Sequence, residues 1–467
     1  MTDNTPATVY LRYGQWQKIY GEKYEDWIKH RWDGCHPDTL VYLRWIAEGP
    51  STKKLFSFQQ EALLKVVFHT EICPLSPKPI LLNLATGTGK TLIMSSIIAY
   101  LQIRQQVDKF LLICPNTIVR DRLKKDFEGN HVFKEFQLFP SSKSDELNRL
   151  QCIVMDGDSL KANNSPLHVS NFIVSNIHQL YTSHASGNNR VKFILDNSSN
   201  LCILNDEAHN TKPAEYEKVL NILGQVTHTR IDLTATPDRA DGKRPNSHEV
   251  MVYDVIDAYN DNIVKATSVY RPDISKYEYI DLDLTWHDKK KPEKKYTGHE
   301  VEAEKLLENP TIQLVTDPAP LRGQLTIAKR RYVEKFALVG DKYKPILFVV
   351  AASVADAEET AKVMKNEFGF KPFVVYGEKE DDKEEMRKVA ANLGDTSSPY
   401  DSIVSVLMLR EGWDVPEVSI IVLLRPFSSP LYARQIIGRG LRKVRKNGID
   451  QNLRQELDVV DHQAGSN

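Results

Sequence analysis

Short apolar runs alternate with amphipathic stretches over two long parts of the chain, from about residue 55 to 237 and again after residue 322. Strands buried on both faces read as continuous apolar runs, and helices must cross between parallel strands. The pattern therefore predicts two α/β domains with parallel sheets. The predicted strands are residues 79–84, 110–114, 171–175, 201–205 and 230–234, then 345–351, 372–376, 402–408 and 419–424, and an apolar run follows at 457–460.

The rest of the chain lacks this rhythm and gives the expected domain boundaries. Residues 1–50 form an N-terminal segment with aromatic residues at helical spacing, which favours packing on the next domain over a base-stacking platform. Residues 51–245 and 321–467 are the two domains, and residues 246–320 are an inserted linker with a lysine run at 289–295. We expect that run to be a solvated loop rather than a phosphate-contacting patch. The aromatic residues are Tyr10, Tyr13, Trp16, Tyr20, Tyr24 and Trp27.

Composition narrows the class of protein only a little. The 467 residues are 41% hydrophobic and 26% charged, which is typical of a folded globular chain. No run approaches the ~18 apolar residues of a membrane span, and no secretory signal is visible, so we expect a cytoplasmic protein without a membrane partner. The five cysteines form no metal-binding pair. With 61 basic against 62 acidic residues, a polyanion would be held by local basic patches.

The first apolar strand ends in a glycine-rich turn, residues 84–91, which an apolar helical stretch follows. A strand, such a turn and a helix start aim backbone N–H groups and the positive helix end at one point, as a triphosphate requires. Lys90 would meet the β- and γ-phosphates of ATP, Thr91 would bind Mg²⁺, and Gly87 and Gly89 would let the backbone approach the anion. Leu84 stands where the general pattern has glycine, and the alternative is a structural turn.

A second polar group, Asp206-Glu207-Ala208-His209, follows the predicted strand 201–205. Ligands of open α/β sheets bind at the carboxyl ends of the strands. Asp206 would hold Mg²⁺, and Glu207 would orient and deprotonate the attacking water. The alternative for two adjacent carboxylates at this place is capping of a helix N-terminus.

These motifs, with six others in order, resemble those of superfamily 2 helicases and translocases, and look most like the motor subunit of type III and type I restriction enzymes. The resemblance covers about residues 55–445 and implies two tandem RecA-like domains that use ATP and Mg²⁺. The six other motifs are Phe58–Ala62, Leu112–Thr117, Thr234–Pro237, Leu347–Ala351, Met408–Val415 and Gln435–Arg442.

The resemblance also implies roles for single residues. Gln59 would contact adenine, Thr86 and Thr88 would complete the phosphate-binding turn, and Gly412 and Asp414 would contact the nucleotide from the second domain. Arg439 and Arg442 would stabilise the charge that develops on the γ-phosphate. They are three apart, so on a helix both would point the same way. The alternative for these arginines is a basic surface helix.

The function that the resemblance implies is ATP-dependent translocation or strand separation on nucleic acid. His209 and the restriction-type motifs favour double-stranded DNA, and nuclease and methyltransferase subunits are the expected partners. No nuclease constellation is visible, so the chain resembles a truncated or split subunit. Two alternatives stay open: an ATPase switch that licenses a partner nuclease without unwinding, and a non-enzymatic, ATP-clamped scaffold that binds DNA.

Overall fold

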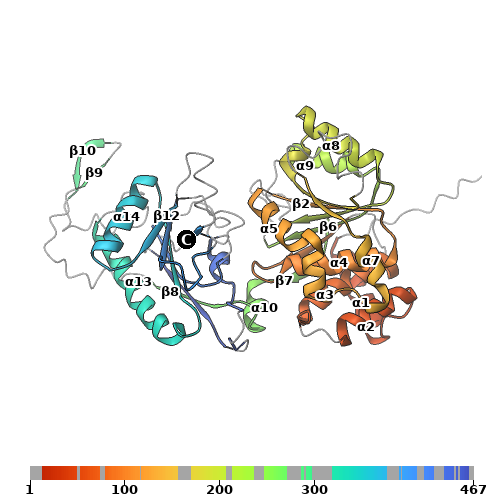
Figure 1. The fold of residues 1–467 in the computed structure, drawn as a ribbon, viewed down its shortest axis with the longest axis horizontal. Helices are drawn as coiled ribbons and strands as arrows, with labels where there is room; N and C mark the ends of the chain where they lie inside the picture. Colours follow the sequence, from red (N-terminus) through yellow and green to blue (C-terminus); the bar gives the residue numbers. More distant parts are fainter. Residues whose placement is uncertain are drawn as a thin grey trace, which may run out of the picture. The chain divides into compact units, whose positions relative to one another are not determined.

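A computed structural model shows two compact units, Met1–Ala85 with Gly89–Asp254, and Thr86–Thr88 with Val255–Asn467 (Figure 1). The structure describes residues 13–49, 53–73, 79–115, 117–155, 170–206, 213–235, 247–270, 286–288, 291–296, 318–375, 389–390, 392–406, 415–424, 436–445, 449–450 and 453–461.

The first unit is built on a seven-stranded parallel sheet with the order β3-β4-β2-β5-β6-β1-β7. The five strands predicted for this part of the chain are confirmed. Two more were not predicted: β3, which is short, and β7, which lies in the segment assigned to the linker. The strands are β1 Ile80–Leu84, β2 Lys109–Cys114, β3 Cys152–Val154, β4 Phe172–Asn176, β5 Leu201–Asp206, β6 Thr227–Thr234 and β7 His248–Tyr253.

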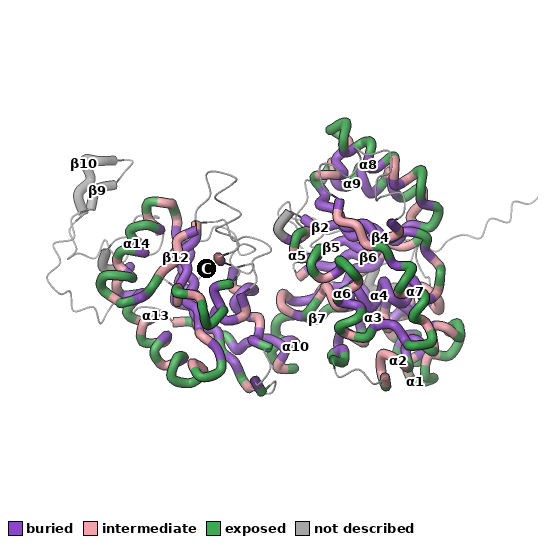
Figure 2. Tube along the Cα trace, in the orientation of Figure 1, coloured by how far each residue is buried: buried purple, intermediate pink, exposed green. Residues whose placement is uncertain are grey.

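Helices cover both faces of this sheet, as the continuous apolar runs predicted (Figures 1 and 2). Leu111 and Ile113 of β2 point to one face and belong to a buried cluster with residues of α8 and α9. Phe110 points to the other face, where Phe172 packs edge-on against Phe127 of α5. The helices are α4 Lys90–Arg104, α5 Thr117–Phe127, α6 His131–Glu135, α7 Ser144–Arg149, α8 Ala185–Asp196 and α9 Pro213–Leu223.

The N-terminal helices α1 (Tyr13–Lys29) and α2 (Pro37–Glu48) belong to the same unit, as do α3 (Ser57–Val67) and the π-helical turn η1 (Phe68–Ile72). Tyr20, Tyr24 and Trp27 of α1 are buried, with ring centroids 5.1, 5.4 and 5.3 Å from that of Phe68. The interpretation of these three aromatic residues as core is therefore confirmed.

One carboxylate, Glu71 at the end of η1, joins these helices to α4. It accepts hydrogen bonds from Thr39 Oγ1 at 2.6 Å, from Tyr100 Oη and Arg104 Nε at 2.9 Å, and from the His36 backbone N–H at 3.0 Å. Burial alone would raise the pKa of Glu71, but these hydrogen bonds outweigh it and lower the pKa.

The second unit is built on a six-stranded parallel sheet with the order β12-β13-β11-β14-β15-β8. The four predicted strands are confirmed, and the apolar run at 457–460 is β15. The edge strand β8 was not predicted, because it lies within the expected linker. The strands are β8 Ala266–Tyr270, β11 Ile346–Val350, β12 Pro372–Val375, β13 Ser402–Ser405, β14 Val418–Leu423 and β15 Glu456–Val460.

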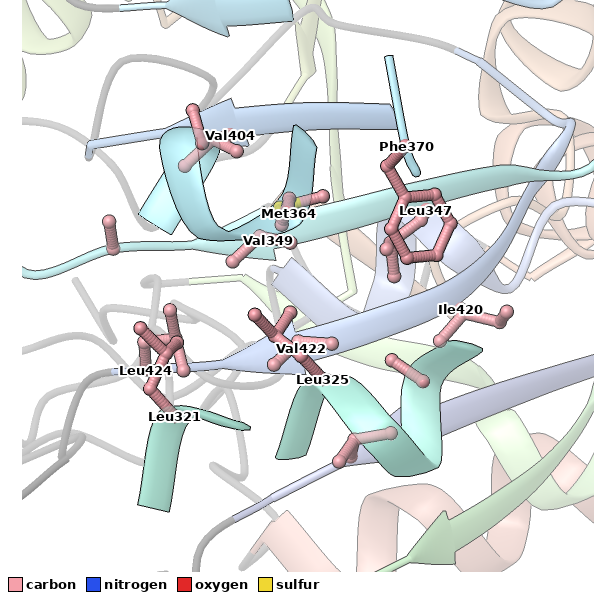
Figure 3. Packing of buried hydrophobic residues seen from close by; sticks show 14 of the residues in the cluster. Leu321, Leu325, Leu347, Val349, Met364, Phe370, Val404, Ile420, Val422 and Leu424 are labelled. Carbon is pink, nitrogen blue, oxygen red and sulfur yellow. The ribbon is translucent and has the colours of Figure 1, made fainter. Parts of the chain in front are cut away.

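One face of this sheet is covered by α13 (Pro318–Val339) and α14 (Val354–Asn366). Figure 3 shows Leu347, Val349 and Val422 of the sheet packed with Leu325 of α13 and Met364 of α14. The short helix α10 (Val255–Asn260) opens the unit, and strands β9 (Trp286–Asp288) and β10 (Lys291–Tyr296) pair antiparallel. Part of the lysine run is therefore a strand and not the expected loop. Among the described helices, none is long and apolar enough to cross a membrane.

Candidate nucleotide-binding site

The turn between β1 and α4 has the geometry of an anion-binding loop. Gly87 and Gly89 both adopt left-handed backbone conformations, with φ of +86° and +78°, which glycine adopts at no steric cost. Lys90 is the first residue of α4, whose 15 residues are almost all buried beyond the first turn. The N-terminus of such a helix carries the positive end of the helix dipole, which attracts an anion.

Gln59 of α3 lies directly against this turn. Its side-chain Oε1 accepts a hydrogen bond from the Phe56 backbone N–H at 3.0 Å, which fixes the amide. A Cβ on Gly89 would lie 2.7 Å from Gln59 Nε2, so the two residues touch. The neighbouring Phe58 stacks on Tyr253 of β7 with centroids 4.0 Å apart, and the Tyr253 carbonyl accepts from the Ala85 N–H. The structure thus brings the predicted adenine contact to the predicted phosphate turn.

Arg122 of α5 was not predicted as a site residue. Its Nη2 atom donates to Thr91 Oγ1 over 3.4 Å, a long hydrogen bond. Thr91 is the hydroxyl expected to bind Mg²⁺, so an arginine from the helix after Pro115 reaches the candidate metal ligand. Local sequence gives no signal for this contact, because the two residues are far apart in the chain.

Asp206 is the last residue of β5 and is 4% exposed. Strands β5, β6 and β1 are neighbours in the parallel sheet, so Asp206 and the turn after β1 lie at the same edge. Next to Asp206, burial raises the pKa of the Cys114 thiol, and the Asp206 charge raises it further. Glu207, Gly412, Asp414 and Gln435 lie outside the described residues.

A buried polar network fixes the strand ends near Asp206. Asn205 donates to Asp232 Oδ1 at 3.1 Å and to the Tyr216 hydroxyl, and Arg230 Nη2 donates to Asp232 Oδ2 at 3.1 Å. Burial raises the pKa of Asp232, while Arg230, Ser247 and Asn205 oppose the rise. An acidic residue in the middle of a buried strand is the sequence signal that could have identified this network.

Arg439 and Arg442 lie in the second unit. Residues 436–440 are helical, and Arg439 is 7% exposed. A Cβ on Gly440 would lie 2.6 Å from Leu457 Cδ1 and 3.0 Å from Ile421 Cδ1, so the end of this helix packs tightly on the sheet. Arg442 is not on the helix but in an antiparallel bridge with Val264. The expectation that both arginines share a helical face is therefore wrong.

The described residues suit ATP and Mg²⁺. Two left-handed glycines, a lysine at a helix start and a threonine hydroxyl suit a phosphate chain, and the Asp206 carboxylate is an oxygen ligand of the kind that Mg²⁺ prefers. In the part of the chain that the structure describes, no group of three or more His, Cys, Asp or Glu residues could hold a metal. A metal held by one or two protein ligands plus phosphates is the usual arrangement for Mg²⁺ in such sites.

Two family models match the chain. The model described as "Type III restriction enzyme, res subunit" matches residues 52–239, and the model described as "Helicase conserved C-terminal domain" matches residues 328–444. No curated protein matches the chain.

Solved structures share the fold. A fragment of a putative HsdR subunit of a type I restriction enzyme from Vibrio vulnificus YJ016 is 16% identical, with a TM-score of 0.56 over 93% of this chain and 68% of that one. The DUF1998 helicase MrfA bound to DNA is 16% identical, with a TM-score of 0.54 over 92% of this chain and 48% of that one. The DEAD-box helicase Mss116 bound to ssRNA and UDP-BeF is 14% identical, with a TM-score of 0.53 over 94% and 74%.

The two parallel sheets and these likenesses define a protein of two tandem RecA-like domains. The chain belongs to the superfamily 2 helicases, with similarity to the motors of type I and type III restriction enzymes. This is a family of ATP-hydrolysing motors that act on nucleic acid.

Proposed function

We propose that the chain is an ATP-dependent DNA helicase or translocase, the motor of a restriction or phage-defence system in the cytoplasm. The observation that carries the proposal is the turn between β1 and α4, in which Gly87 and Gly89 are left-handed directly before Lys90. This turn is a phosphate site at the carboxyl edge of a parallel sheet, where such folds bind their ligands.

Each site residue has its own role in phosphoryl transfer. Lys90 and the backbone of residues 86–91 bind the phosphates, and Gln59 contacts the adenine. Thr91 and Asp206 would hold Mg²⁺, and the metal would supply positive charge for the phosphate oxygens. Glu207 takes a proton from the attacking water. Arg439 and Arg442 stabilise the γ-phosphate charge, with Gly412 and Asp414 as further nucleotide contacts from the second domain.

The proposal also specifies the kind of nucleic acid on which the motor acts. MrfA is bound to DNA and the HsdR fragment comes from a restriction enzyme, whereas Mss116 is bound to ssRNA. The match to the type III restriction subunit over residues 52–239 supports double-stranded DNA. Nuclease and methyltransferase subunits are the partners that such a system would require.

The test is the steady-state rate of ATP hydrolysis by the full chain, titrated separately with duplex DNA, single-stranded DNA and RNA. We expect stimulation by duplex DNA, and loss of turnover with retained fold in Lys90→Ala, because that side chain is at a helix start and not in the core. A strand-displacement assay then separates a motor from a switch that hydrolyses ATP without unwinding. Turnover that is absent, or unaffected by Lys90→Ala, would contradict the proposal.

A further inference from the structure

Residues 262–266, which lead into the second sheet, lie against residues 441–445, which follow Arg439. The Lys265 backbone N–H donates to the Leu441 carbonyl at 2.8 Å, and Val264 forms the antiparallel bridge with Arg442. The backbone at Arg442 is therefore held by one short ladder. This partner segment lies about 180 residues earlier in the chain, so the ladder is a long-range contact.

Side chains reinforce this ladder. Lys443, which is buried, donates from Nζ to Asn262 Oδ1 at 2.8 Å and to the Asn262 carbonyl at 3.2 Å. Arg445 Nη2 donates to the Ile263 carbonyl at 3.1 Å. Asn262 has a φ of +56°, a left-handed conformation that asparagine tolerates better than most residues.

Lys265 adds a second connection, through its side chain. It is 1% exposed, and its Nζ donates to the carbonyls of Pro416 and Val418, where β14 begins. These acceptors lie two and four residues after Asp414, which with Gly412 is an assigned site residue. Burial lowers the pKa of Lys265 to about 7. Glu417 opposes this fall, and Lys335 adds to it. A buried amine needs such acceptors, because a donor that is left without a partner away from water destabilises the folded chain.

One residue thus connects two segments that carry assigned site residues. Its backbone holds the segment of Arg442, and its side chain holds the start of β14 after Asp414. Loss of the side chain would remove this link between the two segments, although both keep their backbone pairings. A displacement of ~1 Å at a reacting group can cost about 10²-fold in rate.

We propose that Lys265 is a positioning residue for ATP turnover, which sets Arg442 and the start of β14 relative to each other. The proposal rests on the proposed function, because it requires Arg442 to take part in hydrolysis. Lys265 itself contacts neither nucleotide nor water in this role.

The test is Lys265→Met, which keeps the length of the side chain without its donors. We expect kcat with duplex DNA to fall about 10²-fold and KM for ATP to stay within about twofold of the parent value. Lys344→Met is the matched control, because Lys344 Nζ also donates to two carbonyls of this unit, those of Ser398 and Tyr400, at 3.0 and 2.8 Å. That variant should lose a similar amount of stability and keep the parent kcat.

The double variant Lys265→Met with Arg442→Ala distinguishes a positioning role from a merely structural one. If Lys265 acts through Arg442, Lys265→Met should cost nothing further in an Arg442→Ala background, whereas independent effects multiply. Where Lys265→Met does not fold, Asn262→Gly removes the side-chain acceptor of Lys443 but keeps the backbone acceptor. It suits the positive φ and should show the same split between kcat and KM.

The outcomes distinguish this proposal from the proposed function. A parent chain without DNA-stimulated turnover, or an Arg442→Ala variant with normal turnover, overturns the function and the positioning role together. An active parent whose Lys265→Met and Asn262→Gly variants keep the parent kcat overturns the positioning role alone. Multiplicative losses in the double variant do so as well.

Discussion

Gln59 and Gly89 are in contact: a Cβ at position 89 would lie only 2.7 Å from the Gln59 side-chain Nε2. The Phe56 N–H holds the amide of Gln59 from the opposite end. Glycine at position 89 is therefore required twice, by its φ of +78° and by the place of its neighbour. Any side chain there would disturb the predicted adenine contact and the phosphate turn at the same time.

Gly89→Ala should weaken nucleotide binding strongly. The left-handed conformation costs a non-glycine residue about 1–2 kcal/mol, and the clash with Gln59 adds to this. Calorimetric titration with ATP and Mg²⁺ measures the affinity. Gly129→Ala is the control, because Gly129 has a φ of +63° but no atom within 4 Å of its Cβ position. That variant should lose stability and keep the parent affinity; equal affinities in both variants would argue against the assigned site.

Arg439→Ala and Arg442→Ala should each abolish turnover, by about 10³- to 10⁵-fold, while ATP affinity changes little. An arginine that acts on the transition state contributes little to ground-state binding. Steady-state kinetics and calorimetry on the same preparations measure the two quantities. Arg330→Ala serves as the control, since Arg330 on α13 is 81% exposed and should leave the rate unchanged. Normal DNA-stimulated turnover in both arginine variants would show that neither arginine takes part in hydrolysis.

Glu71→Gln should destabilise the first unit in a pH-dependent way. Hydrogen bonds depress the pKa of Glu71 below its ordinary 4.5 in the folded chain, so its stabilising effect is complete above that pH. The effect is lost as the pH falls through the lower, folded-state pKa. Urea unfolding near pH 7 should show a loss of about 1.5–3 kcal/mol, the usual value for hydrogen bonds to a charged group. The difference between parent and variant should vanish in acid; a difference constant with pH would contradict the role of the charge.

Gly440→Ala should destabilise the second unit. The new Cβ would meet Leu457 and Ile421 at 2.6–3.0 Å, and overpacking of a close-packed core costs typically about 1–3 kcal/mol. Gly21→Ala provides the opposite case: Gly21 lies within α1, has no atom within 4 Å of its Cβ position, and alanine is favoured there by about 1 kcal/mol. Denaturant unfolding should therefore show a lower free energy of unfolding for Gly440→Ala and a higher one for Gly21→Ala. Destabilisation by both changes would contradict the expectation that alanine at position 21 stabilises α1.

The sheets were predictable from sequence where the apolar runs were continuous. The nine predicted strands and the apolar run of β15 all appear, because a strand buried on both faces leaves that signal. β7 and β8 were missed, since both are less buried and lie among the charged residues assigned to the linker. Whether a short edge segment forms a strand depends on the strand with which it pairs, and the local sequence does not identify that strand.

The site was predictable to the same extent. The glycine-rich turn follows from residues next to each other in sequence, and so does the place of Asp206 at a strand end. The helical pairing of Arg439 with Arg442 was wrong because the helix ends at Gly440, and a bridge to Val264 then determines the backbone. Arg122 and Lys265 were missed for the same reason: each acts on residues distant in the chain.

The parallel pairing of β8 with β15 sets an order on folding. Ala266 pairs with Glu456, so among the strands that the structure describes β8 has no neighbour until β15 has been synthesised. Closing so long a loop costs entropy before any contact repays it, which makes this step slow. On the ribosome, β8 therefore lacks this neighbour until β15 emerges, and the short ladder at Arg442 also forms late, because Val264 must find a partner about 180 residues further along the chain.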